Sequence, residues 1–236
     1  MTGAADRRSG APRVKYCGLG RPEDVAAAAD AGGSYAGLVL AESPRRLTPE
    51  AAARLAREAR RRGLAPVGVF VDRPGAEVRR LAGELDLAVV QLHGSEAPEV
   101  CEELRASGLE VWKAVRPRSP EELEEMVLRH GESADALLVE GWSAERAGGT
   151  ATAFPLRWLE AGSGGARPAR LVLAGGLDPE NVGEAVRRVR PDVVDVSSGV
   201  EGVPGRKDGE RMRAFGRAVR EAVSRESANE EEAERG

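Results

Sequence analysis

Short apolar runs rich in β-branched residues alternate along the chain with longer segments in which Ala, Arg and Glu recur with a helical period. Each short run is apolar enough to be buried on both faces, as is typical of parallel strands. Eight such runs can be counted. The pattern predicts strands at residues 13–17, 35–40, 66–71, 88–92, 110–115, 136–140, 170–174 and 193–196.

A helix is expected after each strand. Several of the helical segments carry proline in the first turn, where its missing N–H costs no hydrogen bond. Thr48 and Asp178 have side chains suited to cap the helices that follow them. The expected helices begin near Pro22, Pro49, Gly75, Ala97, Pro120, Pro155, Pro179 and Asp208.

Eight regular βα units in roughly 210 residues favour an α/β fold of the (β/α)8 TIM-barrel type, because an open doubly wound sheet rarely keeps so even a rhythm. We expect a single domain over residues 13–223. Residues 1–12 are predicted to form a disordered N-terminal tail, and the acidic segment 224–236 a disordered C-terminal tail.

Composition excludes several classes of protein. Charged residues make up 31% of the 236 residues and the net charge is −4, which disfavours nucleic acid as a partner. Two distant cysteines and two histidines indicate neither a disulfide framework nor a zinc site. No apolar run reaches the ~18 residues of a membrane span. We expect a cytoplasmic protein without metal, cofactor or membrane partner.

Lysine is rare in this chain. Every basic residue is arginine except Lys15, Lys113 and Lys207. The lysine ammonium is a compact point charge, whereas the arginine guanidinium is planar and forked. These three positions are therefore candidates for sites that require a compact ammonium. Chance is the competing explanation.

Polar residues that end apolar strands mark the candidate site, because a barrel places its active site at the carboxyl ends of its strands. The period of two puts Cys17 on the same strand face as Lys15, and it turns Glu140 and Asp195 inward from two other strands. These side chains are expected to converge on one mouth. His93 ends a further strand and could contact a ligand or be satisfied by backbone.

Cys17 and Glu140 suit proton transfer. A thiol beside the Lys15 ammonium can become a usable base, although a free cysteine is more often a small buried apolar residue, as we expect for Cys101. The carboxyl of Glu140 suits a general acid, and a salt-bridged structural role is the alternative. Proton transfer between two such side chains requires no cofactor.

Glycine-containing turns follow the seventh and eighth strands, in LAGGLDPENV (173–182) and DVSSGVEG (195–202). Backbone amides in such turns form the phosphate site that is common in barrels. Ordinary tight turning is the alternative. The predicted cradle consists of Gly175, Gly176, Ser198 and Gly199.

Together these pieces resemble the phosphoribosylanthranilate isomerase family over about residues 13–219. The matching segments are VKYCGL followed by RPED, SPRR (43–46), VGVFVD (67–72), VVQLHG (89–94), KAVR (113–116), LAGGLDPENV, and DVSSGVEGVPGRKD ending at Asp208. The resemblance implies an aldose-ketose isomerase of tryptophan synthesis. Such an enzyme converts N-(5-phosphoribosyl)anthranilate to 1-(2-carboxyphenylamino)-1-deoxyribulose 5-phosphate by an Amadori rearrangement.

The resemblance also assigns roles. Cys17 would be the general base at C2 of the sugar, Arg45 would hold the anthranilate carboxylate, and Asp195 would hydrogen-bond the substrate. Lys15 and His93 would line the substrate site. The substrate is a small phosphorylated molecule, and the protein is expected to be a monomer or a homodimer.

Two positions depart from the family pattern. Glu140 stands where the family has an aspartate as general acid, and an extra methylene there moves the carboxyl by more than about 1 Å. The family's Gly-Gly-Thr-Gly-Lys segment reads GGTAT at 148–152. An alternative is therefore a phosphosugar-binding barrel with impaired catalysis. The related histidine-pathway isomerase uses a carboxylate base, and Cys17 argues against it.

Overall fold

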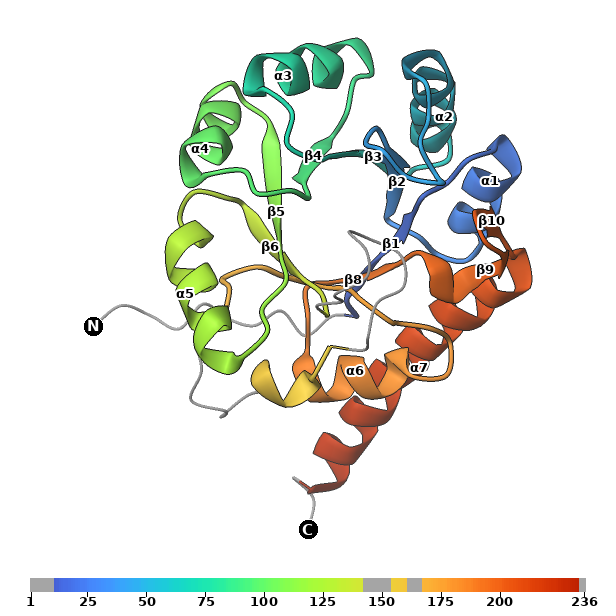
Figure 1. Ribbon diagram of the computed structural model, residues 1–236. Helices are drawn as coiled ribbons and strands as arrows, with labels where there is room; N and C mark the ends of the chain where they lie inside the picture. The colour runs from blue at the N-terminus through green and yellow to red at the C-terminus, as the bar shows by residue number, and fades with distance from the viewer. Residues whose placement is uncertain (1–10, 142–153, 161–166, 234–236) are drawn as a thin grey trace.

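Eight parallel strands close into a barrel in the computed structural model, which describes residues 11–141, 154–160 and 167–233 (Figure 1). The TIM-barrel prediction is confirmed. Three predicted strands differ from the observed ones by one residue at one end, and two differ by one residue at both ends. The strands run in order round the barrel. They are β1 (Arg13–Cys17), β2 (Tyr35–Val39), β3 (Ala65–Phe70), β4 (Val89–Leu92), β5 (Glu110–Val115), β6 (Ala136–Val139), β7 (Leu171–Leu173) and β8 (Val193–Val196).

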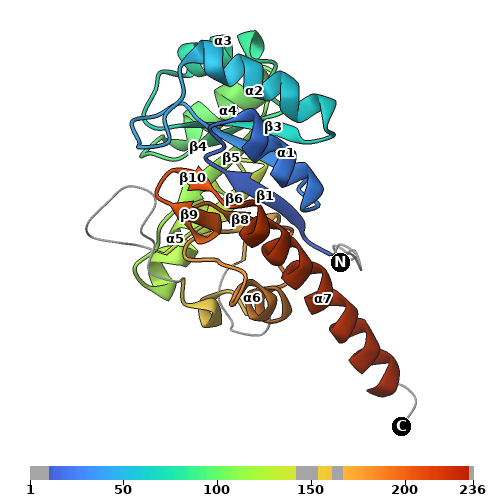
Figure 2. The same ribbon diagram turned by 90° about the vertical axis from the view of Figure 1, so that its right-hand side faces the viewer.

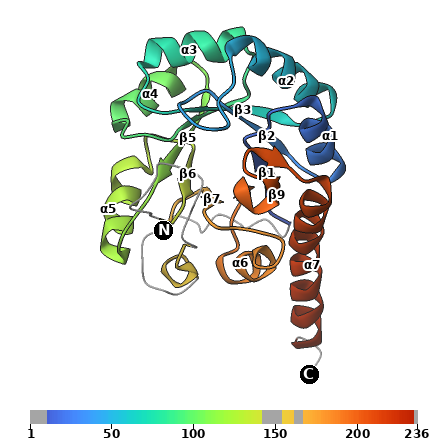
Figure 3. The same cartoon turned by 45° about the vertical axis from the view of Figure 1, so that its right-hand side comes forward.

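Seven α-helices of the described residues surround the barrel (Figure 1). Their apolar faces pack on the outer face of the sheet in the clusters that contain Leu55, Leu81, Leu104 and Phe215. The last helix lies beside the first and closes the ring (Figure 3). The helices are α1 (Pro22–Asp30), α2 (Pro49–Arg61), α3 (Gly75–Glu84), α4 (Pro98–Ala106), α5 (Pro120–His130), α6 (Val182–Val189) and α7 (Gly209–Ala233).

The two helices predicted on either side of the seventh strand differ from expectation. At Pro155 the described residues form only the 3-10 helix η1 (Leu156–Trp158), and residues 161–166 lie outside the described residues. After β7, the Asp178 carboxylate accepts hydrogen bonds at 2.9 Å from the backbone N–H groups of Glu180 and Asn181. This Asx-type turn delays α6 until Val182.

The C-terminal segment also differs. Disorder was predicted from residue 224, yet α7 continues to Ala233 and projects beyond the barrel (Figure 2). Its acidic sequence is rich in Ala, Glu and Arg, which are strong helix formers, so local propensity extends the helix. Most of the predicted N-terminal tail, residues 1–10, lies outside the described residues, as do residues 234–236.

The barrel interior is apolar at its amino-terminal end and charged toward its mouth. Trp112 is buried and packs edge-on against Tyr35, with ring centroids 4.9 Å apart. Arg170 and Arg13 lie over these two rings and cover the amino-terminal end. Lys15, which is paired in register with Tyr35, places a buried charge beside this aromatic pair.

A small hairpin of β9 (Glu201–Val203) and β10 (Arg206–Lys207) follows β8 and the 3-10 helix η2 (Ser198–Val200). It turns the chain back, so that Glu201 and Lys207 meet in an ion pair at 2.8 Å. No helix among the described residues is long and apolar enough to cross a membrane.

Gly37 on β2 is a position where the barrel wall has no space for a side chain. It is paired in register with Cys17, and an alanine Cβ there would lie 2.8 Å from Cys17 Cα and 2.9 Å from its Sγ. We expect Gly37→Ala to lower the free energy of unfolding by about 1–3 kcal/mol, because crowding in a packed wall forces backbone shifts. Urea denaturation measures this.

Gly83 in α3 is the matched control, since an added Cβ there meets nothing within 4 Å. Gly83→Ala should leave stability unchanged or raise it by up to about 1 kcal/mol. Equal stability of the two variants would contradict the packing described for β1 and β2.

Candidate active site

A cavity of about 110 Å³ opens at the carboxyl ends of the strands. Cys17, Glu140 and Asp195 all line it, together with Gln91 and His93. The prediction from strand ends and the period of two is thus confirmed for the placement of these side chains. Cys17 and Asp195 come from β1 and β8, which are neighbours in the closed barrel, and Glu140 directly follows β6.

A buried ion pair lies at the base of this cavity. Lys15 Nζ donates to Asp195 Oδ1 at 2.9 Å, and the two residues are directly paired across β1 and β8. The Lys15 side chain is 0% exposed and that of Asp195 9%. Burial alone would lower the pKa of Lys15, but Asp195 and Cys17 raise it above its ordinary value, so the ammonium is retained.

Cys17 sits next to this pair. Burial has the largest effect on the pKa of its thiol and raises it. The Lys15 charge opposes burial, the Asp195 charge adds to it, and Lys207 opposes it more weakly, so that the pKa stays above its ordinary value. The sequence suggested Lys15 as the cation that favours the thiolate. In the structure Asp195 offsets much of that effect, and Cys17 is a neutral thiol in the ligand-free site.

Glu140 lies between His93 and the cationic Arg116. Its carboxylate contacts His93 Nε2 at 3.0 Å and forms an ion pair with the Arg116 guanidinium. Burial alone would raise the pKa of Glu140, but His93 and Arg116 outweigh it and lower the pKa to about 2. The carboxyl is therefore ionised in the ligand-free site, and His93 has a side-chain partner as well as its place in the cavity.

Arg45 lines the opposite part of the cavity wall, where Glu201 fixes its direction. Arg45 donates from Nε and Nη2 to the two carboxylate oxygens of Glu201, at 2.7 and 2.8 Å. Lys207 holds the same carboxylate at 2.8 Å. Burial would raise the pKa of Glu201, but Arg45 and Lys207 lower it to about 2. The outer edge of the Arg45 guanidinium stays free of Glu201.

The two glycine turns lie after β7 and β8, as predicted. Gly175 and Gly176 have φ values of 85° and 69°, a region that favours glycine. A Cβ on Gly199 would lie 1.9 Å from the carbonyl oxygen of Leu177, so this position also requires glycine. Ser198 in the second turn is exposed, and the three glycines are half-buried. Both turns follow the carboxyl ends of their strands, but none of these four residues lines the mouth cavity.

Three residues of the site were not singled out for it from the sequence. Arg116 and Glu201 fall inside the quoted motifs, yet no local pattern shows that one pairs with Glu140 and the other with Arg45. Lys207 was singled out from the sequence only as one of three lysines, and the rarity of lysine was a signal that could have assigned it to the site. The altered segment 148–152 lies outside the described residues. Among the described residues, no group of three or more His, Cys, Asp or Glu side chains could hold a metal ion.

Comparison with known families gives one consistent result. The family model for N-(5'-phosphoribosyl)anthranilate (PRA) isomerase matches residues 14–218. A protein of Pelobacter propionicus named N-(5'-phosphoribosyl)anthranilate isomerase is 41% identical over 217 residues, which cover 90% of this chain and 97% of the relative. One of the same name from Paracoccus denitrificans is 44% identical, covering 86% and 94%.

Solved structures agree. Phosphoribosyl anthranilate isomerase of Thermotoga maritima superposes with a TM-score of 0.78 at 34% identity, covering 89% of this chain and 98% of that one. A structure of phosphoribosyl anthranilate isomerase in complex with reduced 1-(o-carboxyphenylamino)-1-deoxyribulose 5-phosphate superposes with a TM-score of 0.74, also at 34% identity and the same coverage.

The ion pairs of Glu140 predict how stability depends on pH. A carboxyl whose pKa is lowered on folding stabilises the protein above its unfolded pKa, and this contribution is lost as the pH falls through the folded value of about 2. We expect the difference in free energy of unfolding between wild type and Glu140→Gln to shrink by up to about 3 kcal/mol from pH 5 to pH 2.

Chemical denaturation at a series of pH values measures this. Glu124→Gln, an exposed change on α5, is the control, and its free energy of unfolding should change with pH in the same way as that of wild type. A Glu140→Gln profile that also runs parallel to wild type would contradict the ion pairs described for this carboxylate.

Proposed function

From the premise that the chain belongs to the N-(5'-phosphoribosyl)anthranilate isomerase family, we propose which of its residues carry the reaction. The protein is an isomerase of tryptophan synthesis. It converts N-(5-phosphoribosyl)anthranilate to 1-(2-carboxyphenylamino)-1-deoxyribulose 5-phosphate, the third step from chorismate. The observation that carries the residue assignments is that Cys17 and Glu140 line one cavity from distant parts of the chain.

Glu140 acts as the general acid. Its proton passes to the furanose ring oxygen while the bond from C1 to that oxygen breaks, and the nitrogen lone pair forms the C=N bond of a protonated Schiff base. Glu140 must hold a proton for this step, whereas Arg116 and His93 keep it ionised in the ligand-free site. Substrate binding therefore has to weaken one of these two contacts.

Cys17 acts as the general base. As a thiolate it takes the proton from C2, and the C–H electron pair forms the C1=C2 bond while the C=N electrons return to nitrogen, which gives an enolamine. Tautomerisation of that enol gives the ketone. After both transfers Cys17 is a thiol and Glu140 a carboxylate, which are the protonation states favoured in the ligand-free site. Before the next turnover, Cys17 must lose its proton and Glu140 must regain one.

The ends of the substrate are held by different groups. The edge of Arg45 that Glu201 leaves free can bind the anthranilate carboxylate, because a guanidinium offers donors along more than one edge. The turns at Gly175, Gly176 and Gly199, with Ser198, offer backbone N–H groups to the phosphate. His93 and Asp195 contact the sugar between them. The substrate contact expected of Lys15 is not supported, because its side chain is 0% exposed and its ammonium is directed to Asp195, so Lys15 positions that carboxylate instead.

The alternative of a phosphosugar-binding barrel with impaired catalysis is not supported by the relatives, which are named isomerases at about 40% identity over most of the chain. Glu140 also reaches a cavity-lining position, despite its extra methylene. We further propose that the enzyme works in the cytoplasm as a monomer or a homodimer. The Thermotoga maritima structures include monomers generated from a dimeric isomerase.

Removal of the base should abolish turnover. We expect purified wild type to isomerise phosphoribosylanthranilate, and Cys17→Ala to lose about 10²–10⁴ in kcat, the usual contribution of a positioned proton acceptor. Loss of substrate fluorescence measures the rate. Cys101→Ala, on α4 and away from the mouth, is the control and should keep its activity. An inactive wild type, or an unimpaired Cys17→Ala, would contradict the assignment.

The neighbouring carboxylate can be tested through substrate affinity. Glu201→Gln keeps the shape of the side chain but weakens its hold on Arg45, so we expect KM to rise about ten-fold while kcat changes less. Steady-state kinetics measure KM and kcat separately. Glu184→Gln, an exposed change on α6, is the control. The idea fails if KM stays constant and only kcat falls.

A further inference from the structure

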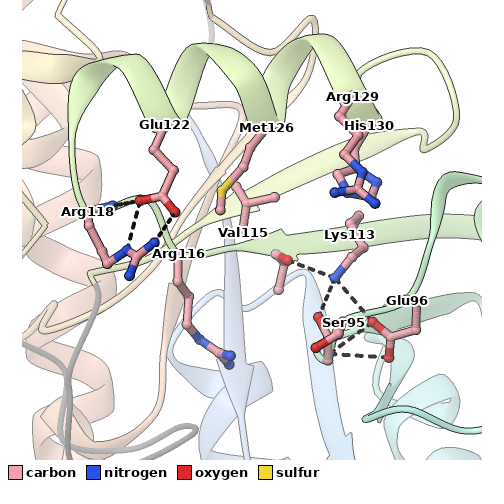
Figure 4. A pocket seen from close by; sticks show the side chains of 12 residues that line it. Ser95, Glu96, Lys113, Val115, Arg116, Arg118, Glu122, Met126, Arg129 and His130 are labelled. Atoms are coloured by element: carbon pink, nitrogen blue, oxygen red, sulfur yellow. Dashed lines mark hydrogen bonds and ion pairs between the residues drawn. The ribbon is translucent and has the colours of Figure 1, made fainter.

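A second and larger cavity, of about 420 Å³, lies outside the barrel, between α5, the end of β5 and the segment that follows β4 (Figure 4). None of the described residues that line it also lines the mouth cavity. Figure 4 shows α5 side chains pointing toward those of β5 across this groove. We call it the α5 groove, and define it by Glu96, Lys113, Arg118, Met126, Arg129 and His130.

The ion pairs of the α5 groove leave one cation over. Four basic side chains and two acidic ones line it, namely Lys113, Arg116, Arg118, Arg129, Glu96 and Glu122. Three of the cations are neutralised by glutamates: Lys113 by Glu96 at 3.1 Å, Arg118 by Glu122 at 2.9 Å, and Arg116 by Glu140. Arg129 has no ion-pair partner among the described residues, and its guanidinium is exposed on the groove side of α5 (Figure 4).

His130 supplies independent evidence. It is 7% exposed, and its Nδ1 is buried with no hydrogen-bond partner among the described residues. Burial has the largest effect on the pKa of His130 and lowers it. The charges of Lys113 on β5 and Arg129 on α5 lower it as well, Glu96 and Glu99 oppose them more weakly, and the pKa is about 4. The field at this imidazole is therefore positive, as expected of a site that lacks an anion.

The walls of the groove are fixed in place. Lys113 Nζ donates to the carbonyl oxygens of Gly94 and Ala114, at 2.7 and 2.9 Å, and also contacts Glu96. All three of its protons are thus used, so Lys113 holds the β4 and β5 ends of the groove together. The compact ammonium suits this position, where a planar guanidinium could not reach three acceptors in the same way.

We propose that the α5 groove binds a phosphate-type oxyanion, held by the unpaired Arg129 guanidinium beside His130. A guanidinium matches the oxygens of phosphate in a bidentate manner. The cavity is large enough for the ion together with its waters. This site is distinct from the glycine turns after β7 and β8, which are on other strands of the barrel.

The chain has two histidines, and each reports one of the two sites, since His93 lines the mouth and His130 the groove. The full chain with labelled imidazoles is titrated with inorganic phosphate, and sodium chloride keeps the ionic strength constant. We expect the His130 resonances to shift saturably, and the pH midpoint of His130 to rise when phosphate is present, because the bound anion stabilises the imidazolium.

Arg129→Gln is the test variant. It should weaken the response of His130 to phosphate at least about ten-fold, as expected for loss of a charge-assisted hydrogen bond, and leave the response of His93 unchanged. Arg54→Gln, an exposed change on α2, is the matched control and should respond like wild type. The proposal is overturned if only His93 responds, if chloride alone shifts His130 equally, or if Arg129→Gln responds like wild type.

Discussion

The ion pair between Lys15 and Asp195 is the interaction on which the active site depends. Closing the barrel brings β1 against β8 and puts both side chains in its interior, where an unpaired charge would cost several kcal/mol. Pairing them removes that cost and leaves no net charge beneath Cys17. Loss of one partner would cost about 3–5 kcal/mol, because the other would remain buried and uncompensated.

This cancellation has a chemical consequence. With Lys15 paired, burial has the largest effect on Cys17 and the proton stays on sulfur, while the contacts of Glu140 with Arg116 and His93 keep its carboxylate ionised. Cys17 and Glu140 together hold one proton in the ligand-free site, as the reaction requires. That proton is on the base, Cys17, instead of on the acid, Glu140. Substrate binding must reverse that distribution. The contacts of Glu140 are at the edge of the cavity, where a ligand can reach them.

Much of this could be predicted from the sequence. The strands were predicted to within about a residue because each is a short, largely apolar run between helical segments. The positions of Cys17, Glu140 and Asp195 near the carboxyl ends of their strands, together with the period of two, predicted that they converge. The structure near Pro155 and the length of α7 were not predicted correctly. At both places short-range helix propensity competes with turns and capping. The pairing of Arg45 with Glu201 spans 156 residues, and no local pattern encodes it.

The most direct test of this account is the pH titration of thiolate absorbance in Cys101→Ser, where Cys17 is the remaining thiol. The account predicts a midpoint above the ordinary thiol value of about 8.5 in the ligand-free protein. Adding Asp195→Asn should lower that midpoint, because Lys15 then acts on the sulfur alone. A midpoint below pH 7 without Asp195→Asn, or one that this change leaves unmoved, would contradict the account.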